Sequence, residues 1–449
     1  PDRFCEGVEN KPMPFPDRLY QADKHAEPFW QPNEIGGHLN EDYFGGDLKG
    51  IQLKLPYLHE MGVDYLYLNP IFEAHSNHRY NTADYLNVDP LLGTNEDFET
   101  LCKEAAKYGI GIVLDGVFSH TGSDSRYFNR EGRYGEGGAY RDPNSPYRSW
   151  YDFDPKYKGG YRSWWGFETL PEVNEETPSF VEFITGKGGV IDTWLRRGAA
   201  GFRLDVADEL PDAFIEKIRA AVKRVSPEKF LLGEVWEDAT TKYGFGHRRT
   251  YLLGKGLDSV MNYPFKNAVL DFVKGKPAEQ AAGEILSICE HYPAPALNTA
   301  LNFLSTHDTE RALTVIADEP ANGRGREWQS GRNVSGEAYE EGMLRLRMAY
   351  AIIYTLPGLP CLYYGDEIGM QGYRDPFNRG YYCWDSHEER LKPVLAQLAH
   401  LRHSCEAFRT GALRVLRAEG GVLHYQRVGA TETAEIIVNR SEHIIVEPL

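Results

Sequence analysis

The chain has 449 residues, of which 66 are acidic and 49 are basic, and its formal net charge is −17. A surface this acidic argues against nucleic acid and anionic membranes as main partners. The sequence contains no run of 18 apolar residues, so we expect no transmembrane helix. A chain of this length allows two or three domains, or one large barrel with attached domains.

The six cysteines are scattered along the chain without a C-x-x-C pair, so they predict neither a zinc site nor a dense disulfide framework. Free thiols are typical of a reducing compartment, which favours a cytoplasmic over a secreted location. The chain begins at Pro1 and shows no signal peptide. A missing signal says nothing about export if the true start lies upstream, so the compartment stays open.

Short apolar runs alternate with amphipathic segments along most of the chain. The apolar runs predict strands over 63–68, 110–115, 201–205, 230–234, 259–262, 301–305 and 360–364. The amphipathic segments predict helices over 48–61, 97–108, 180–197, 211–225, 265–273, 341–354 and 388–403. Continuous apolar strands that alternate with helices indicate a parallel sheet, and seven of them favour an α/β TIM (β/α)8 barrel over an open sheet.

Two regions depart from a plain barrel. About 60 residues rich in Gly, Tyr, Ser, Arg and Trp follow the strand that ends at Asp115, and a structureless loop of that length is uncommon. We therefore expect a catalytic barrel over 1–120 and 176–404, with a small inserted domain over 121–175 after the third barrel strand. Short β-like pieces near the end predict a C-terminal antiparallel β domain over 405–449, and the polar segment 318–337 is expected to be a mobile loop.

Acidic side chains stand at or just past the ends of the predicted strands, on the face where TIM barrels carry their chemistry. Arg203 and Asp205 project from the same face of one strand, so the guanidinium is expected to keep the carboxylate ionised. Glu234 ends the next strand, about 4.8 Å away, and the two acids can flank one bond at the roughly 5–5.5 Å separation of retaining glycosidases. One acid alone could be a helix cap or half of an ion pair. Together with Asp115 and Asp308, in barrel order, they favour a cluster that raises the pKa of one member.

Six ordered motifs carry a family resemblance. They are NHRYNTADY at 77–85, DGVFSH at 115–120, GFRLD at 201–205, GEVW at 233–236, HD at 307–308 and GLPCLYYGDE at 358–367. In this order they resemble the motifs of the α-amylase family of retaining glycoside hydrolases and transglycosylases. The resemblance covers nearly the whole chain, and six motifs in order are far more specific than one.

The resemblance implies a role for each matching residue. Asp205 would be the nucleophile, Glu234 the acid/base and Asp308 the acid that stabilises the transition state. The residues expected to bind the substrate are Tyr80, His78, Asp115, His120, Arg203, His307, Trp236, Asp375 and Arg379. Packing alone could explain an aromatic ring or a histidine among them, and Asp375 with Arg379 could be a plain surface ion pair.

Further segments resemble one branch of the family, which holds neopullulanases, cyclomaltodextrinases, maltogenic amylases and amylopullulanases. They are YFGGDLKGI at 43–51, WWGF at 164–167, LPEVN at 170–174, DSVMNYP at 258–264 and DPFNR at 375–379. In the last of these, Asp375 and Arg379 match the branch's pair for the second sugar on the donor side. An acid and a guanidinium in one loop can hold two sugar hydroxyls at once.

Two departures from the family bear on calcium. Ser119 stands where the family has a calcium-binding Asn, and Val8 stands where the branch leads us to expect an Asp. Calcium needs several oxygen ligands, so their loss favours a protein that requires no metal. The Gly45 carbonyl and Asp47 remain as candidate calcium ligands.

The leading hypothesis is hydrolysis of α-1,4-glucosidic bonds, with α-1,6 bonds left open, in maltooligosaccharides, cyclodextrins, pullulan or starch. A transglycosylase with the same acids is the alternative, because attack by water or by a sugar depends on the shape of the acceptor site. A non-catalytic glycan-binding barrel is a third, remote reading, since every expected catalytic residue is present. The partner would be an α-glucan, and a homodimer stays open.

The resemblance also suggests that this sequence is part of a longer protein. In relatives, the residues that match 1–4 would follow the first barrel strand directly. We therefore expect the first strand upstream of Pro1 and a C-terminal domain that continues past Leu449.

Overall fold

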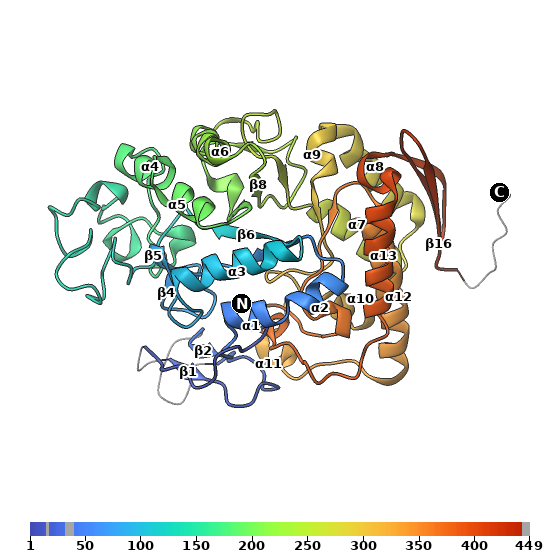
Figure 1. Ribbon diagram of the computed structural model, residues 1–449, viewed down its shortest axis with the longest axis horizontal. Helices are drawn as coiled ribbons and strands as arrows, with labels where there is room; N and C mark the ends of the chain where they lie inside the picture. Colours follow the sequence, from blue (N-terminus) through green and yellow to red (C-terminus); the bar gives the residue numbers. More distant parts are fainter. Residues whose placement is uncertain (15–17, 32–39, 442–449) are drawn as a thin grey trace.

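A computed structural model describes residues 1–14, 18–31 and 40–441 of the chain. In Figure 1 the strands of the central sheet lie in the middle of an elongated molecule. The segment 121–175 lies at one end of the long axis, and the C-terminal sheet lies at the other.

Seven short strands follow one another in barrel order. They are β3 (Tyr65–Leu68), β6 (Gly111–Gly116), β7 (Gly201–Leu204), β8 (Phe230–Gly233), β11 (Ser259–Val260), β12 (Leu301–Asn302) and β13 (Leu359–Pro360). The first five form a parallel sheet in the order β11-β8-β7-β6-β3, and β12 pairs in parallel with β13. A parallel bridge from Met261 to Leu301 connects the two sheets. In residues 1–14, 18–31 and 40–441 no ladder joins β13 to β3, so the TIM barrel is not closed by hydrogen bonds there.

Helices follow the strands as the alternating pattern predicts, and Figure 1 shows them around the sheet. They are α1 (Leu48–Leu53), α2 (Leu55–Glu60), α3 (Asn95–Lys107), α4 (Pro178–Thr185), α5 (Val190–Arg196), α6 (Asp212–Val225), α7 (Tyr263–Lys274), α8 (Ala278–His291), α9 (Ala294–Asn298), α10 (Ala312–Ala317), α11 (Arg326–Gln329), α12 (Gly336–Thr355), α13 (Lys392–Ser404) and α14 (Glu406–Thr410). Single 3-10 turns are η1 (Arg148–Trp150), η2 (Lys158–Gly160), η3 (Trp164–Gly166), η4 (Ala207–Glu209), η5 (Asp366–Ile368) and η6 (Phe377–Arg379).

Two predicted helices are each broken into two. The segment 48–61 is interrupted at Lys54, after which Pro56 lies in the first turn of α2, where its missing N–H costs nothing. The segment 180–197 is interrupted between Gly186 and Gly189, which includes Gly188 at φ 76°. Apolar periodicity continues across both breaks, and so it could not reveal them.

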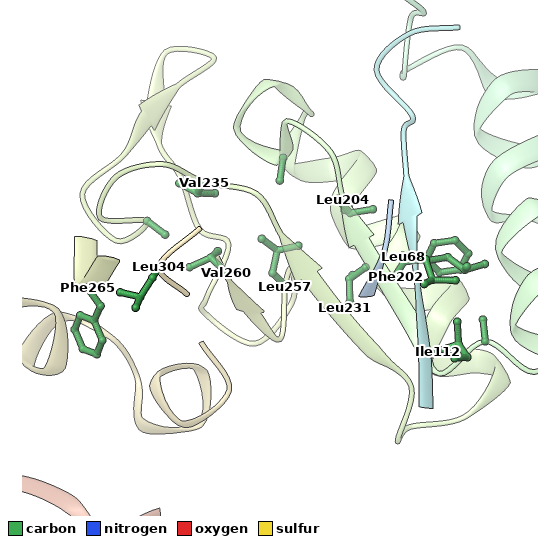
Figure 2. Close-up of a cluster of buried hydrophobic side chains, with 14 of the residues drawn as sticks. Leu68, Ile112, Phe202, Leu204, Leu231, Val235, Leu257, Val260, Phe265 and Leu304 are labelled. Atoms are coloured by element: carbon green, nitrogen blue, oxygen red, sulfur yellow. The ribbon is translucent and has the colours of Figure 1, made fainter. Parts of the chain in front are cut away.

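The barrel strands are apolar on both faces because helices cover one side and the packed interior fills the other. Phe202, Leu204 and Leu231 are fully buried on neighbouring strands. Figure 2 shows buried side chains from successive strands and from the segments that follow them, among them Ile112, Leu231 and Leu304. Each such side chain contributes about 1.5–3 kcal/mol of burial free energy, and together they hold the strand ends that carry the polar residues.

Three smaller sheets lie outside the barrel. They are the parallel pair β1 (Leu19–Tyr20) and β2 (Asp42–Tyr43), the antiparallel pair β4 (Phe72–Ala74) and β5 (Thr82–Val88), and the antiparallel pair β9 (Tyr243–Gly244) and β10 (His247–Arg248). The segment 121–175 consists mainly of turns around buried aromatic rings such as Phe128 and Trp150. The polar segment expected as a loop contains α11, and its Trp328 lies against Tyr373.

The predicted C-terminal antiparallel sheet is confirmed. Its strands β14 (Ala412–Glu419), β15 (Val422–Val428) and β16 (Thr433–Asn439) pair in sequence order. The expected continuation to Leu449 lies outside the described residues. Within the described part of the chain, no helix has the length and apolar character that crossing a membrane requires.

Candidate active site

The main chain brings the predicted acids to one edge of the sheet. Asp115 pairs with Arg203 in the register of β6 and β7. Just past the strands, the Asp205 N–H donates to the Gly116 carbonyl at 3.1 Å, and the Glu234 N–H donates to the Leu204 carbonyl at 3.0 Å. The parallel ladder therefore continues one residue beyond β7 and β8 and fixes the backbone under both acids.

A single guanidinium connects three carboxylates. Arg203 is fully buried, and its Nη1 lies 2.9 Å from Asp115 Oδ1 and 2.8 Å from Asp205 Oδ1. Its Nη2 lies 2.9 Å from Glu234 Oε2. Because Asp205 and Glu234 both contact the same planar guanidinium, their carboxylates lie close together. Two acids that act on one bond must lie close together in this way.

The pKa values of the acids depend on more groups than Arg203. Burial raises the pKa of Asp205 well above its usual range; Arg203 opposes the shift, and the carboxylates of Glu234, Asp115 and Asp308 reinforce it. Burial and the neighbouring carboxylates therefore act against the ionised form of Asp205, which Arg203 favours. Burial also acts to raise the pKa of Asp308, but His307 and then Arg379 and Arg203 outweigh it and hold that pKa below its usual range.

Tyr80 stands at the centre of a polar network on one side of the cluster. Its hydroxyl donates to Asp115 Oδ2 at 2.8 Å and lies 2.6 Å from His307 Nε2, and the Tyr80 and His307 rings are stacked. Because Tyr80 has one hydroxyl proton, its contact with His307 requires an N–H at Nε2. Tyr67 also donates to Asp115 Oδ2, at 2.6 Å. Asp115 is thus held by protein groups and in turn orients Arg203.

Two of the three predicted histidines, His78 and His120, have lowered pKa values and are neutral around pH 7. Burial, with Arg379 as the next cause, lowers the pKa of His78 to about 3. Its Nδ1 accepts the Tyr80 N–H at 3.0 Å, which places the proton on Nε2 as a donor. Burial lowers the pKa of His120 to about 4, and its Nε2 lies 3.1 Å from the Tyr80 carbonyl. The Ser119 hydroxyl lies 3.0 Å from His120 Nδ1, so the residue in the place of a calcium ligand orients this ring.

Trp236 lies directly on the predicted acid/base. Its indole N–H donates to Glu234 Oε1 at 3.0 Å, and its ring stacks on Tyr263 with centroids 4.1 Å apart. The Trp236 side chain is 44% exposed, so one ring face is open to a ligand while the other rests on a buried tyrosine.

The pair predicted for the second sugar is close to the third acid. Arg379 lies on η6, with its Nη1 3.1 Å from Asp375 Oδ1 and its Nη2 3.5 Å from Asp308 Oδ1. Arg379 Nε donates to the His307 carbonyl at 2.9 Å. The ion pair is therefore part of the same network as Asp308 and not an isolated surface contact.

Sequence reasoning missed two features beside the acids. Val206 follows Asp205 and has a φ of 40°, a left-handed conformation that is strained for a β-branched residue. In this conformation its N–H donates to Glu234 Oε2 at 2.9 Å, which ties the two acids together through the backbone. Nothing in the local sequence signals this, because valine after an apolar strand looks like its continuation.

The second missed feature is a carboxylate that holds two tryptophans. Glu209, on η4, accepts the indole N–H of Trp164 at 2.7 Å and that of Trp165 at 2.9 Å. Trp164 also lies against the His120 ring, with centroids 5.5 Å apart, and Trp165 is 77% exposed. The motif WWGF signalled the family branch, but its link to Glu209 depends on a contact across 45 positions of sequence.

The candidate calcium ligands belong to a separate loop before α1. The Gly45 carbonyl and Asp47 Oδ2 each lie 2.6 Å from the ammonium of Lys11. Within the described ranges, no group of three or more Asp, Glu, His or Cys side chains is arranged to hold a metal ion.

The chain is similar in sequence to a known protein family and to several known proteins. Residues 1–409 match the family described as "Alpha amylase, catalytic domain". An amylopullulanase of Thermoanaerobacter thermohydrosulfuricus is 35% identical over 480 aligned positions, which cover 95% of this chain and 31% of the relative. A cyclomaltodextrinase of Geobacillus thermopakistaniensis is 32% identical and is covered to 64% of its length. The chain thus spans about a third of the first relative and just under two thirds of the second.

A solved structure resembles the fold over nearly its whole length. The ligand-free cyclic α-maltosyl-(1→6)-maltose hydrolase of Arthrobacter globiformis superposes with a TM-score of 0.81 at 28% sequence identity. The match covers 98% of this chain and 90% of that structure.

Proposed function

The chain belongs to the alpha-amylase catalytic-domain family, and on this premise we propose that it is a retaining glycoside hydrolase that cleaves α-1,4-glucosidic bonds in α-glucans. The observation that carries the proposal is the buried Arg203 guanidinium, which holds Asp205 and Glu234 together at the ends of adjacent strands. Two carboxyl groups held this close are the arrangement of a double displacement, in which one acts as nucleophile and the other as acid and base.

In the first step Glu234 gives its proton to the glycosidic oxygen while Asp205 attacks the anomeric carbon. The bond from that carbon to the leaving oxygen breaks, and its electron pair stays with the oxygen. The sugar is then joined to Asp205 through a β-linked ester. In the second step Glu234 removes a proton from water, the water oxygen attacks the anomeric carbon, and the Asp205 carboxylate leaves. Two inversions restore the α configuration.

The surrounding residues have complementary roles in this proposal. Asp308, held ionised by His307 and Arg379, stabilises the positive charge that develops on the sugar ring. Tyr80 and His78 provide ring faces and a neutral N–H donor at the reacting sugar. Asp375 and Arg379 bind the next sugar on the donor side.

Two exposed aromatic residues near the acids would receive the departing chain. Trp236 offers an open ring face next to Glu234. Trp165, fixed through Glu209 and 77% exposed, extends an apolar surface beyond His120 and Trp164. Stacking on sugar faces suits such rings, so we propose that they bind the acceptor end of the glucan. The Arthrobacter relative is a hydrolase of cyclic α-maltosyl-(1→6)-maltose, which contains a 1→6 linkage, and this makes α-1,6 bonds a second substrate to test.

Two variants and one spectroscopic measurement test the proposal. Asp205→Asn and Glu234→Gln should each lower kcat on soluble starch and maltotriose by about 10³-fold or more, with a melting temperature that shows a folded protein. Asp208→Asn and Glu237→Gln are matched controls, since each acid lies three residues further along the chain and pairs with Lys242. Proton NMR of the first products should show the α-anomer before mutarotation. A first product in the β configuration, or near-normal turnover by either variant, would refute the mechanism.

Product analysis separates hydrolysis from transfer. At high maltooligosaccharide concentration, a hydrolase gives only chains shorter than the substrate, whereas a transglycosylase also gives longer ones. All three proposed catalytic acids come from one chain, so the reaction needs no second copy. A homodimer stays a prediction, which analytical ultracentrifugation can test.

A further inference from the structure

Asp47 is the centre of the loop that connects the N-terminal segment to the first helix. It is almost fully buried and caps α1, where its Oδ1 accepts the Gly50 N–H at 2.6 Å. The Gly7 and Val8 N–H groups donate to its two oxygens at 3.1 and 3.0 Å. Three amides from two distant segments therefore converge on one carboxylate.

Ammonium groups supply the positive charge at this loop. Lys11 Nζ lies 2.6 Å from Asp47 Oδ2 and 2.6 Å from the Gly45 carbonyl, and its side chain is 10% exposed. Beside it, Lys24 donates to the Phe44 carbonyl and lies 2.9 Å from Glu6 Oε2. Two carbonyls of the loop, at positions 44 and 45, thus each accept a hydrogen bond from a lysine.

The same atoms do not fit a calcium ion. Calcium takes six to eight oxygen ligands at about 2.3–2.6 Å. The two candidate oxygens, from Gly45 and Asp47, already accept from Lys11, and the remaining contacts of Asp47 are to amide N–H groups. The Val8 side chain is 48% exposed and brings no oxygen to the loop.

We propose that the Lys11 ammonium is a built-in cation that does the structural work of a metal ion at this loop. Its charge neutralises buried Asp47, and its N–H groups hold the Gly45 carbonyl, so the loop needs no bound calcium to keep its shape. An ammonium is a compact charge with three donors on a flexible stem, which suits two oxygens at hydrogen-bonding distance.

The anchored segment also supports the candidate active site. Arg3 donates to the Arg379 carbonyl at 3.3 Å and accepts, through its own carbonyl, the Tyr382 N–H at 2.8 Å. The Trp384 indole donates to the Phe4 carbonyl at 2.7 Å. Fixing residues 1–11 therefore steadies the chain that carries Arg379.

Thermal unfolding tests the inference without reference to activity. The melting temperature of the unaltered protein should be the same in excess EDTA and in millimolar calcium chloride. Lys11→Met keeps the length of the side chain but removes the charge, and should lower the melting temperature by about 3–5 °C because buried Asp47 loses its cation. Lys49→Met is the control: Lys49 lies two residues after Asp47, is exposed and donates to Gln52 at 3.0 Å, so the melting temperature of this variant should stay within about 1 °C.

Each result decides for or against the built-in cation. A melting temperature of the unaltered protein that rises with calcium or falls in EDTA would overturn the proposal, and this measurement needs no variant. Equal melting temperatures for Lys11→Met and Lys49→Met would overturn it as well. If Lys11→Met does not fold, Lys11→Arg keeps the charge and should fold, with a melting temperature that EDTA does not change. An EDTA-sensitive Lys11→Arg would again argue for a metal.

Discussion

Removal of Arg203 should destabilise the protein in a strongly pH-dependent way. The variant Arg203→Met leaves three buried carboxylates, of Asp115, Asp205 and Glu234, without the cation that they share. Loss of one partner from a buried ion pair costs about 3–5 kcal/mol when the remaining charge is uncompensated. For 449 residues the entropy of unfolding is about 0.9 kcal/mol/K, so this cost corresponds to a melting temperature lower by about 3–5 °C.

The sign of the pH dependence follows from the carboxyl groups. Arg203 opposes the rise in the pKa of Asp205, so its removal raises that pKa further. A carboxyl group with a raised pKa in the folded state stabilises the fold below its unfolded value, and this stability is lost as pH rises through the folded value. The destabilisation by Arg203→Met should therefore be large at about pH 8 and much smaller at about pH 5, where the cluster takes up protons.

Differential scanning fluorimetry at the two pH values measures this effect. Arg196→Met serves as the control, because the Arg196 side chain is 66% exposed and its buried partner Asp192 keeps a second cation, Arg224, at 3.0 Å. Loss of so exposed a cation should cost about 1 kcal/mol or less. A shift for Arg203→Met that is the same at both pH values would refute the electrostatic reasoning. A shift no larger than that of Arg196→Met would show that the three carboxylates do not depend on this guanidinium.

Three further predictions concern groups around the acids. Tyr67→Phe removes the 2.6 Å hydrogen bond to Asp115 and should lower kcat about tenfold with little change in KM, whereas a change confined to KM would argue against a positioning role. Trp165→Ala should raise KM for maltoheptaose several-fold more than KM for maltotriose. The control is Tyr65→Ala, which removes an exposed aromatic ring at the start of β3 and should change neither KM. Equal effects of Trp165→Ala on both substrates would refute the acceptor role. Because the pKa of His78 is lowered to about 3, its ring NMR signals should not titrate between about pH 5 and pH 8, and a midpoint in that window would contradict the neutral ring that burial favours.

The positions of the acids could be predicted because they depend on local pattern. Continuous apolar strands place their last residue at the carboxyl edge of a parallel sheet, so Asp205 and Glu234 could be assigned to one face from spacing alone. Their supports could not be predicted in this way. Tyr67 lies inside an apolar run and looks like core, and the left-handed backbone of Val206 has no signature in a valine.

Long-range contacts set the other limit. Glu209 meets Trp164 across 45 positions, and Lys11 meets Asp47 across 36, so neither pair falls within one helical or strand period. The helix breaks at Lys54 and at 186–189 could not be predicted for a different, local reason: the apolar periodicity continues through them. Apolar periodicity indicates which face of a helix or strand is buried, but it does not indicate which distant polar group a side chain will contact.

The arrangement of charge explains how neighbouring acids can favour different protonation states. Asp205 is buried and Asp308 is partly exposed, and desolvation acts to raise the pKa of each. Asp205 faces other carboxylates, and its pKa goes up; Asp308 faces His307 and Arg379, and its pKa goes down. The surroundings of Asp205 therefore favour a proton in that cluster, while those of Asp308 favour its negative form. A double displacement needs both conditions at once, because one proton must be available for the leaving oxygen and one fixed negative charge must face the cationic sugar ring.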